Sequence, residues 1–235
     1  MERDVFNQNA KTFDVSMSSF MTRVYQWMMI GVLITGLVAM TIASNSEMLR
    51  TFVFGPMKWL VIIAQFGIVI TLGGFVNKLS VTAATMLFLA YSAITGVTLS
   101  ILAFVYTAAS IQTAFFTTGV SFAALAIFGH TTKKDLSAVG TFCMMGLIGI
   151  LVFSLISMFI PSMHTEGISM FVNIGILIIF AGFTAYDAQR IKAMGQYASD
   201  ADSKSKLAII GALSMYLNFI NMFISILQLT GDRRK

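Results

Sequence analysis

Charged side chains are scarce: they make up 11% of this 235-residue chain, whereas 57% of its residues are hydrophobic. A soluble domain usually carries about 25% charged residues. The charges are therefore too few to cover a surface that faces water, which excludes an ordinary soluble fold. We predict instead an all-α, polytopic membrane protein whose surface is largely in contact with the lipid bilayer.

Cysteine and proline are also scarce. Cys143 is the only cysteine, which excludes an intramolecular disulfide and a cysteine-based zinc site. The two prolines, Pro56 and Pro161, fall between apolar segments, so they are expected to separate spans rather than kink them. The sequence also has no glycine-rich phosphate loop, no HExxH pattern and no credible Ser-His-Asp set. We therefore expect neither an enzyme nor a resident cofactor.

Long apolar runs define the organisation of the chain. A run of about 20 apolar residues can cross the hydrocarbon core of a bilayer, which is about 30 Å thick. We predict seven spans, at residues 24–44, 57–76, 80–105, 109–129, 137–160, 168–188 and 207–229. They form a single transmembrane domain, 24–235. The preceding polar tail, 1–23, lacks the apolar core of a cleaved signal, and a short interfacial helix is expected near Phe20 to Trp27.

The distribution of basic residues predicts the orientation, because lysine and arginine favour the cytoplasmic side. They form no basic face interleaved with aromatics, so no nucleic-acid partner is expected. With seven spans and a cytoplasmic N-terminus, ten of the 15 basic residues lie inside and five outside. The basic C-terminal tail then lies outside. The alternative is a re-entrant last segment, with both termini inside.

Asp187 is the acidic residue that falls within an apolar run, near the end of the predicted span 168–188. An ionisable residue within a span is a functional candidate by default, since burying its charge is costly. Two simpler interpretations remain open. Asp187 could be solvated at the interface, or it could pair with Arg190 three residues later.

Asn218 and Asn221 lie in the predicted last span, three residues apart and hence on one helix face. Polar side chains in spans commonly form hydrogen bonds between helices. This pair therefore either holds helices together or lines a cavity or ion path. Elsewhere, Gly73-Gly74 and Gly146-x-x-Gly149 are expected to permit close helix packing.

Four segments resemble the motifs of the Bax inhibitor-1 (TMBIM) family, of bacterial type. In chain order, the four segments resemble the family's third-span signature, its Lys-Asp-Leu-Ser connector, its sixth-span motif and its last-span motif. They occur in the family order, at residues 91–100, 129–137, 184–192 and 212–223.

The resemblance implies seven spans, with the last helix central and the other six around it. It also implies a calcium leak in the membrane that is gated by protons. In such family members two aspartates, one in each of the last two spans, share a proton and hold the pore shut. Such a pair titrates as a unit, because two neighbouring carboxylates do not readily both ionise.

Asp187 matches the first of these aspartates, but the second position holds Asn218. Asn218 cannot share a proton between carboxylates, and a site with one negative charge holds a divalent cation less well. Lys78 aligns with a basic residue that contacts the pair in some members. The expected pore and pH-sensing residues are Asp187, Asn218, Asn221 and Lys78, with Asp187 as the metal-contacting residue.

Helix geometry adds a structural expectation. Asn218 lies 11 residues beyond Leu207, which corresponds to a depth of about 17 Å at 1.5 Å per residue. For Asp187 to meet it, the sixth helix must continue past the membrane to near Ala198. We therefore predict a long sixth helix, and one that ended before Arg190 would exclude the pairing.

Two functions remain in competition. The first is a pH-modulated channel or leak for Ca²⁺ or another cation in a bacterial inner membrane. The second is a non-conducting regulator that binds another membrane protein, such as a protease or a death-pathway partner. An intramembrane aspartyl hydrolase is disfavoured because it would need two carboxylates at one depth.

Overall fold

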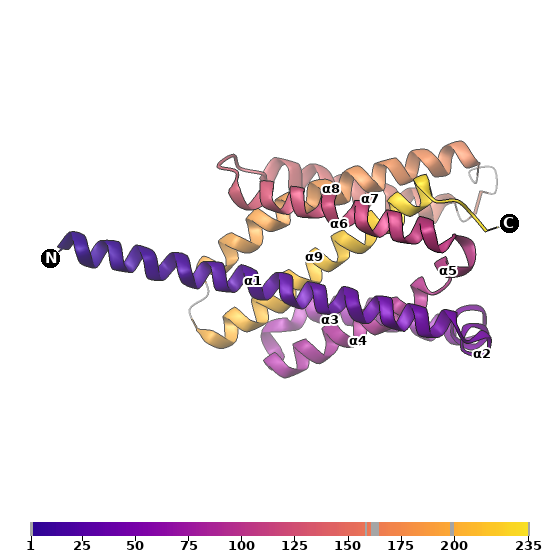
Figure 1. Cartoon of the computed structure of the whole chain (residues 1–235), viewed down its shortest axis with the longest axis horizontal. Helices are drawn as coiled ribbons and strands as arrows, with labels where there is room; N and C mark the ends of the chain where they lie inside the picture. Colours follow the sequence, from indigo (N-terminus) through magenta and orange to yellow (C-terminus); the bar gives the residue numbers. More distant parts are fainter. Residues whose placement is uncertain (1, 158, 161–164, 198–199, 235) are drawn as a thin grey trace. The chain divides into compact units, whose positions relative to one another are not determined.

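The computed structural model describes residues 2–157, 159–160, 165–197 and 200–234. Within these ranges the chain forms helices and one isolated β-bridge (Figure 1). Seven helical segments are long and apolar enough to cross a membrane, and they confirm the predicted count. They are Ser18–Ala43, Met57–Phe75, Val81–Val105, Ala108–Thr131, Ser137–Ser157, Glu166–Gln196 and Ala201–Thr230. Pro161, predicted to separate two spans, lies outside the described residues.

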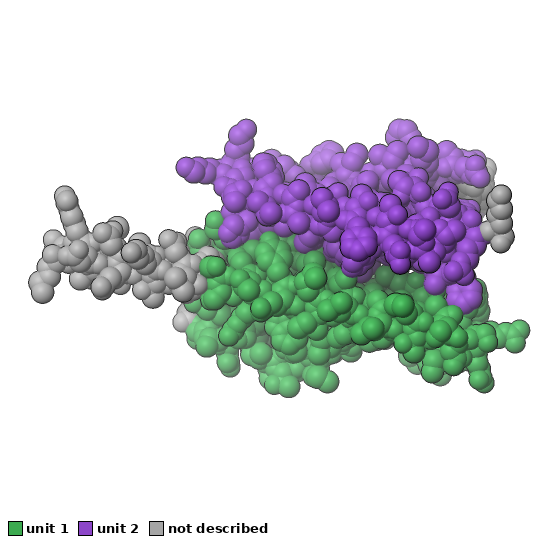
Figure 2. All heavy atoms as spheres, in the orientation of Figure 1, with its two compact units in different colours: residues 1–100, 190–216 green, residues 101–189, 217–235 purple. Residues whose placement is uncertain are grey.

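The chain divides into two compact units (Figure 2). Unit 1 comprises Met1–Ser100 and Arg190–Tyr216, and unit 2 comprises Ile101–Gln189 and Leu217–Lys235. Two long helices, α8 (Glu166–Tyr197) and α9 (Ala201–Thr230), contribute to both units. The predicted division into a tail, 1–23, and one transmembrane domain, 24–235, stays a prediction.

Unit 1 contains the first three spans, in α1 (Glu2–Ala43), α3 (Met57–Phe75) and α4 (Val81–Leu99). Helix α1 is continuous, so the residues of the expected short interfacial helix, Phe20 to Trp27, lie inside a longer one. The connector between the first two spans is also helical. It holds α2 (Ser46–Leu49), followed by a π-helical turn.

Tyr216 of α9 is the centre of the packing in unit 1. Its ring is fully buried and makes edge contacts with Phe88 and Tyr91, each at 5.9 Å between ring centroids. Its hydroxyl lies 2.6 Å from Oγ1 of Thr35. Because Thr35 already donates its proton to backbone carbonyls, including that of Ser92 at 2.8 Å, Tyr216 is the donor to Thr35. One buried network thus joins α1, α4 and α9.

The predicted span 80–105 is interrupted near its end. Helix α4 ends at Leu99, and a short helix α5 (Leu102–Val105) follows a turn. The hydroxyl of Ser100 donates to the carbonyl of Val97 at 2.6 Å, which competes with continuation of the helix. The predicted span is confirmed as Val81–Val105, with a turn near its end that the sequence did not indicate.

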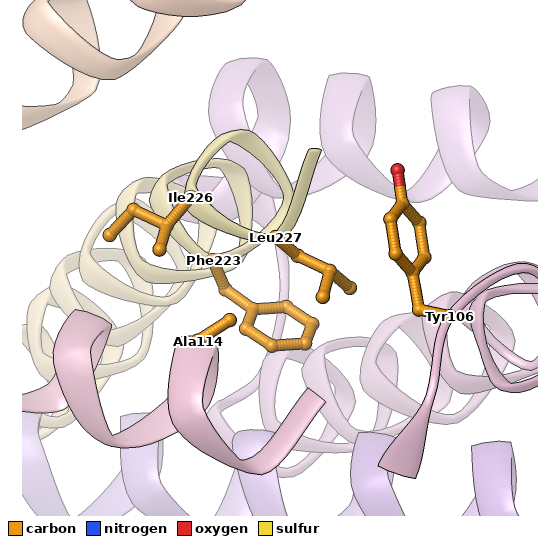
Figure 3. Close-up of a cluster of buried hydrophobic side chains, with 5 residues drawn as sticks. All are labelled: Tyr106, Ala114, Phe223, Ile226 and Leu227. Carbon is orange, nitrogen blue, oxygen red and sulfur yellow. The ribbon is translucent and has the colours of Figure 1, made fainter. Parts of the chain in front are cut away.

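Unit 2 contains α6 (Ala108–Thr131), α7 (Ser137–Ser157), most of α8 and the second half of α9. Helices α6 and α9 run antiparallel, since Phe122 pairs with Phe219 at 5.6 Å and Phe115 with Phe223 at 6.3 Å. Figure 3 shows the end of this interface, where Phe223 and its neighbours on α9 lie near Ala114.

The C-terminal residues continue this pairing to the start of α6. Tyr106 and Arg233 form a β-bridge, in which the N–H of Thr107 donates to the carbonyl of Asp232 at 3.1 Å and that of Arg234 to Val105 at 2.9 Å. The second half of α9 therefore packs along α6 from Phe122 towards its first residues and ends beside them. The last segment is one continuous helix that is long and apolar enough to cross a membrane, and the side on which the C-terminus lies stays a prediction.

Helix α9 is the most buried of the seven spans. In its most apolar stretch 67% of the residues are buried, whereas the other spans reach 33% at most. A helix that is buried on most of its sides is surrounded by protein rather than by lipid. This burial agrees with a central place for the last helix, which stays a prediction.

Candidate functional site

A hydrogen bond joins Asp187 of α8 to Asn218 of α9 within unit 2. The amide nitrogen Nδ2 of Asn218 donates to the carboxylate oxygen Oδ2 of Asp187 at 2.9 Å. Both side chains are buried, with 6% of Asp187 and 4% of Asn218 exposed. The predicted pairing is confirmed, and the interpretation of Asp187 as a solvated interfacial residue is wrong.

The length of α8 brings the pair together. The helix continues to Tyr197, well past Arg190, as the depth of Asn218 required. Ala198, the predicted end point, lies outside the described residues. Gly195 does not interrupt the helix and instead permits close packing, since a Cβ atom added there would overlap the ring of Phe20 in unit 1.

Close packing at glycines fixes the part of α8 that carries Asp187. A Cβ added at Gly129 of α6 would overlap the backbone carbonyl oxygen of Ala185. One added at Gly140 of α7 would lie 2.8 Å from the ring of Tyr186. Small residues let helix backbones approach closely in membranes. Helices α6 and α7 thus hold α8 directly before Asp187.

The glycines that the sequence suggested for close packing are not the ones that hold α8 directly before Asp187. Only Gly146 of that set would crowd a neighbour, Ile179, at 2.8 Å. A Cβ at Gly73, Gly74 or Gly149 meets nothing within 4 Å, so close packing at these positions is a wrong prediction. The segments that resemble the family motifs did contain Gly129 and Ala185, but nothing in the sequence pairs them.

Gln189 anchors the connector between α6 and α7 to α8. Its side-chain oxygen accepts from the backbone N–H of Leu136 at 2.9 Å, and its Nε2 donates to the carbonyl of Lys134 at 2.8 Å. These bonds satisfy backbone groups that the connector would otherwise leave exposed or unpaired. The Lys-Asp-Leu-Ser segment is thus attached to α8 at Gln189, two residues after Asp187. The sequence did not indicate this attachment.

Asp135 in the same connector forms the turn that starts α7. Its Oδ1 accepts from the hydroxyl of Ser137 at 2.7 Å and from the backbone N–H of Ser137 at 2.9 Å. These hydrogen bonds, the hydroxyl contributing most, hold the pKa of Asp135 below its ordinary value of 3.8. The ionised carboxylate therefore stabilises the folded chain above that pH.

An Asp135→Ala variant is expected to melt at a lower temperature than the wild type at neutral pH. Because the pKa of Asp135 is depressed on folding, the difference should shrink as the pH falls from 3.8 through the lowered folded value. Thermal melting in detergent at neutral and acidic pH measures it. A difference that persisted unchanged in acid would contradict this role of the carboxylate.

The other two predicted site residues, Asn221 and Lys78, have contacts other than the Asp187–Asn218 hydrogen bond. Nδ2 of Asn221 donates to the carbonyl of Leu217, one turn earlier in its own helix, at 2.8 Å. Lys78 lies in unit 1, where it is exposed and its ammonium group is 5.5 Å from the centre of the Phe75 ring. Their roles at a pore or pH sensor stay predictions.

The Asp187–Asn218 pair can stay hydrogen-bonded in both protonation states of Asp187, unlike a pair of ionised carboxylates. An amide offers both donors and an acceptor, so Asn218 can donate to an ionised Asp187 or accept from a protonated one. Among the described residues, no group of three or more His, Cys, Asp or Glu side chains could hold a metal ion. Asp187 as a metal ligand therefore stays a prediction.

The fold and this site define a seven-helix membrane protein with an acid–amide pair buried between its last two spans. Residues 17–235 match the family described as "Inhibitor of apoptosis-promoting Bax1". The chain therefore belongs to the Bax inhibitor-1 family, and the resemblance found in its motifs is confirmed.

Relatives match almost end to end. "Inner membrane protein YbhL" of Escherichia coli strain K12 is 42% identical over 222 residues, which is 93% of each chain. A Borreliella burgdorferi protein is 37% identical over 92% of this chain and 93% of its own. An "Uncharacterized membrane protein" of Streptococcus pyogenes serotype M6 is 33% identical over 93% and 94% respectively. Each of these alignments therefore covers more than nine-tenths of both chains.

Proposed function

We propose that the protein is a cation leak whose conducting path passes the Asp187–Asn218 pair. The single observation that carries this proposal is the 2.9 Å hydrogen bond between these buried side chains on two membrane-spanning helices. A buried carboxylate in a span is expensive, and such residues commonly mark ion or proton pathways. Tight packing around α8 gives the carboxylate a fixed position.

Ca²⁺ is the cation that we propose as the transported ion. Hard divalent cations prefer oxygen ligands, and Asp187 and Asn218 together offer carboxylate and amide oxygens. One carboxylate alone binds a divalent ion weakly. Conduction needs binding that is strong enough for entry and weak enough for release, which suits a transported ion better than a resident one.

We further propose that protons modulate the leak through Asp187. Ionisation of this carboxylate sets the charge that a passing cation meets. Because Asn218 can stay hydrogen-bonded in either protonation state, the pair has no strong reason to separate when the pH changes. The modulation should therefore be graded rather than a switch between open and shut.

The proposed setting is a bacterial inner membrane with the N-terminus in the cytoplasm. The E. coli relative is named an inner membrane protein, and the excess of basic residues on one side favours this orientation. The basic C-terminal tail then lies on the opposite side, an exception to the bias.

Reconstitution in liposomes tests the proposed leak. We expect Ca²⁺ influx above that of empty vesicles, with a rate that changes gradually rather than abruptly over a series of pH values. Both the wild type and an Asn218→Asp variant should be tested. If neither differed from empty vesicles at any pH, the proposed leak would be refuted.

The second candidate is a non-conducting regulator that binds another membrane protein. The observation that favours it is Asn218 itself, since the site has one carboxylate where the family pattern expects two. A membrane protease or a death-pathway protein is the kind of partner proposed. Crosslinking and pull-down from native membranes separate the two candidates, and a clean monomer without a partner counts against the regulator.

A further inference from the structure

Unit 1 contains a cavity of about 340 Å³ that is distinct from the Asp187–Asn218 pair. Its lining comes from α1, α4 and α9, and it combines polar and apolar groups. The polar side chains are those of Arg23, Gln26, Thr85 and Ser205. Its volume falls in the range of about 300–1,000 Å³ that is usual for small-molecule sites.

The cavity lies near one end of the three spans that line it. Arg23 and Trp27 lie in the first turns of the span Ser18–Ala43, Thr85 lies one turn into α4, and Ser205 one turn into α9. Arginine and tryptophan are typical of the level where lipid head groups meet the hydrocarbon. The cavity is therefore within reach of a lipid head group.

The lining combines one cationic side chain with an apolar wall. The Arg23 guanidinium presents several N–H donors in a geometry that suits phosphate oxygens. The amide of Gln26 and the hydroxyl of Ser205 also line the cavity and can donate hydrogen bonds. Trp27 and Ile30 continue the lining with apolar surface. A free phosphate ion would use the donors but leave this wall without a function.

We propose that this cavity binds an anionic membrane phospholipid, with the phosphate at Arg23 and the start of an acyl chain along Trp27 and Ile30. Charge complementarity supports an anionic head group. Arg23 is the one charged side chain among the residues that line the cavity, and its guanidinium pairs well with phosphate. The occupied site joins the middle of α1 to the beginnings of α4 and α9.

Fluorescence of Trp27 tests the proposal, because the chain has two tryptophans and the other, Trp59, is exposed on α3. A Trp59→Phe variant is placed in phosphatidylcholine nanodiscs that contain a small, equal fraction of either brominated phosphatidylglycerol or brominated phosphatidylcholine. We expect brominated phosphatidylglycerol to quench Trp27 about threefold more strongly, since the basic site concentrates anionic lipid. Equal quenching by the two lipids would overturn the proposal.

Two further variants test whether the preference for anionic lipid depends on Arg23. Arg23→Gln, in the Trp59→Phe background, should reduce quenching by the anionic lipid to the phosphatidylcholine level. Lys58→Gln removes a basic residue of unit 1 that does not line the cavity, and it should preserve the preference. If millimolar inorganic phosphate abolished the preference, a free anion would be the ligand and the lipid assignment would be wrong. The comparison of lipids in the unaltered cavity decides the proposal even if Arg23→Gln misfolds.

Discussion

Replacing Asn218 by aspartate is expected to convert a graded pH response into a steep one. The new carboxylate would face Asp187 at the position where an amide now donates at 2.9 Å. At low pH the two carboxyl groups share a proton and stay together. As the pH rises both ionise, and two like charges about 4 Å apart repel by about 4 kcal/mol at an effective dielectric constant of 20. The pair then separates and opens the path.

The expected change in flux is large. A shift of about 1.4 kcal/mol in the closed–open equilibrium already changes populations about tenfold. Ca²⁺ influx into liposomes carrying Asn218→Asp should therefore rise at least tenfold across the transition, in excess of the wild-type change. The measurement is the initial rate of influx at a series of pH values.

Asn221→Asp is the matched control, because it adds the same charge one turn further along α9. The amide of Asn221 binds the carbonyl of Leu217 in its own helix rather than Asp187. Its pH profile should be less steep than that of Asn218→Asp, because the new carboxylate would replace an amide that binds its own helix. If Asn218→Asp and Asn221→Asp gave the same profile, the specific pairing of residue 218 with Asp187 would have no part in gating.

Gly129→Ala is expected to destabilise the protein more than any other conservative change near the site. The added methyl group would overlap the carbonyl oxygen of Ala185, which belongs to the backbone and cannot rotate away. Forcing α6 from α8 should cost about 3 kcal/mol or more. At about 2–4 °C per kcal/mol, this corresponds to a fall in melting temperature of about 6–12 °C.

Cys143 provides the readout, since it is the only cysteine and only 2% of it is exposed in the folded protein. A thiol-reactive dye therefore reports the unfolding of unit 2 during heating. Gly119→Ala is the control on the same helix, where an added Cβ meets nothing within 4 Å. It should melt no lower than the wild type, because alanine favours a helix by about 0.5–1 kcal/mol over glycine. Equal melting of the two variants would contradict the close approach at Gly129.

The sequence was sufficient for the number of spans and for the central contact of the site. Apolar runs report burial in lipid directly, so all seven spans could be located. The pairing of Asp187 with Asn218 was suggested by the resemblance to the family, and helix rise and depth added the condition that α8 extend beyond its apolar stretch. That extension was predictable because no proline occurs between residues 188 and 198.

Local breaks and close contacts were not predictable in the same way. The turn after Leu99 depends on a hydroxyl–carbonyl bond of Ser100, which competes with a helix that the apolar pattern favours. Glycine spacing indicates that close packing is possible, but not which helix comes near. Gly73 and Gly74 were therefore chosen wrongly, whereas Gly129 was missed. Such contacts depend on tertiary arrangement, on which a single sequence carries little information.

The central claim is that the charge of Asp187 acts on the ion path, and Ca²⁺ flux through Asp187→Asn tests it most directly. This variant keeps the size of the side chain and can still pair with Asn218, but it cannot ionise. We predict that its flux falls about tenfold, equivalent to about 1.4 kcal/mol in the barrier, and no longer changes with pH. Asp135→Asn, which removes an exposed carboxylate, should conduct as the wild type does. An Asp187→Asn variant that inserted normally and kept both the wild-type flux and its pH dependence would contradict the claim.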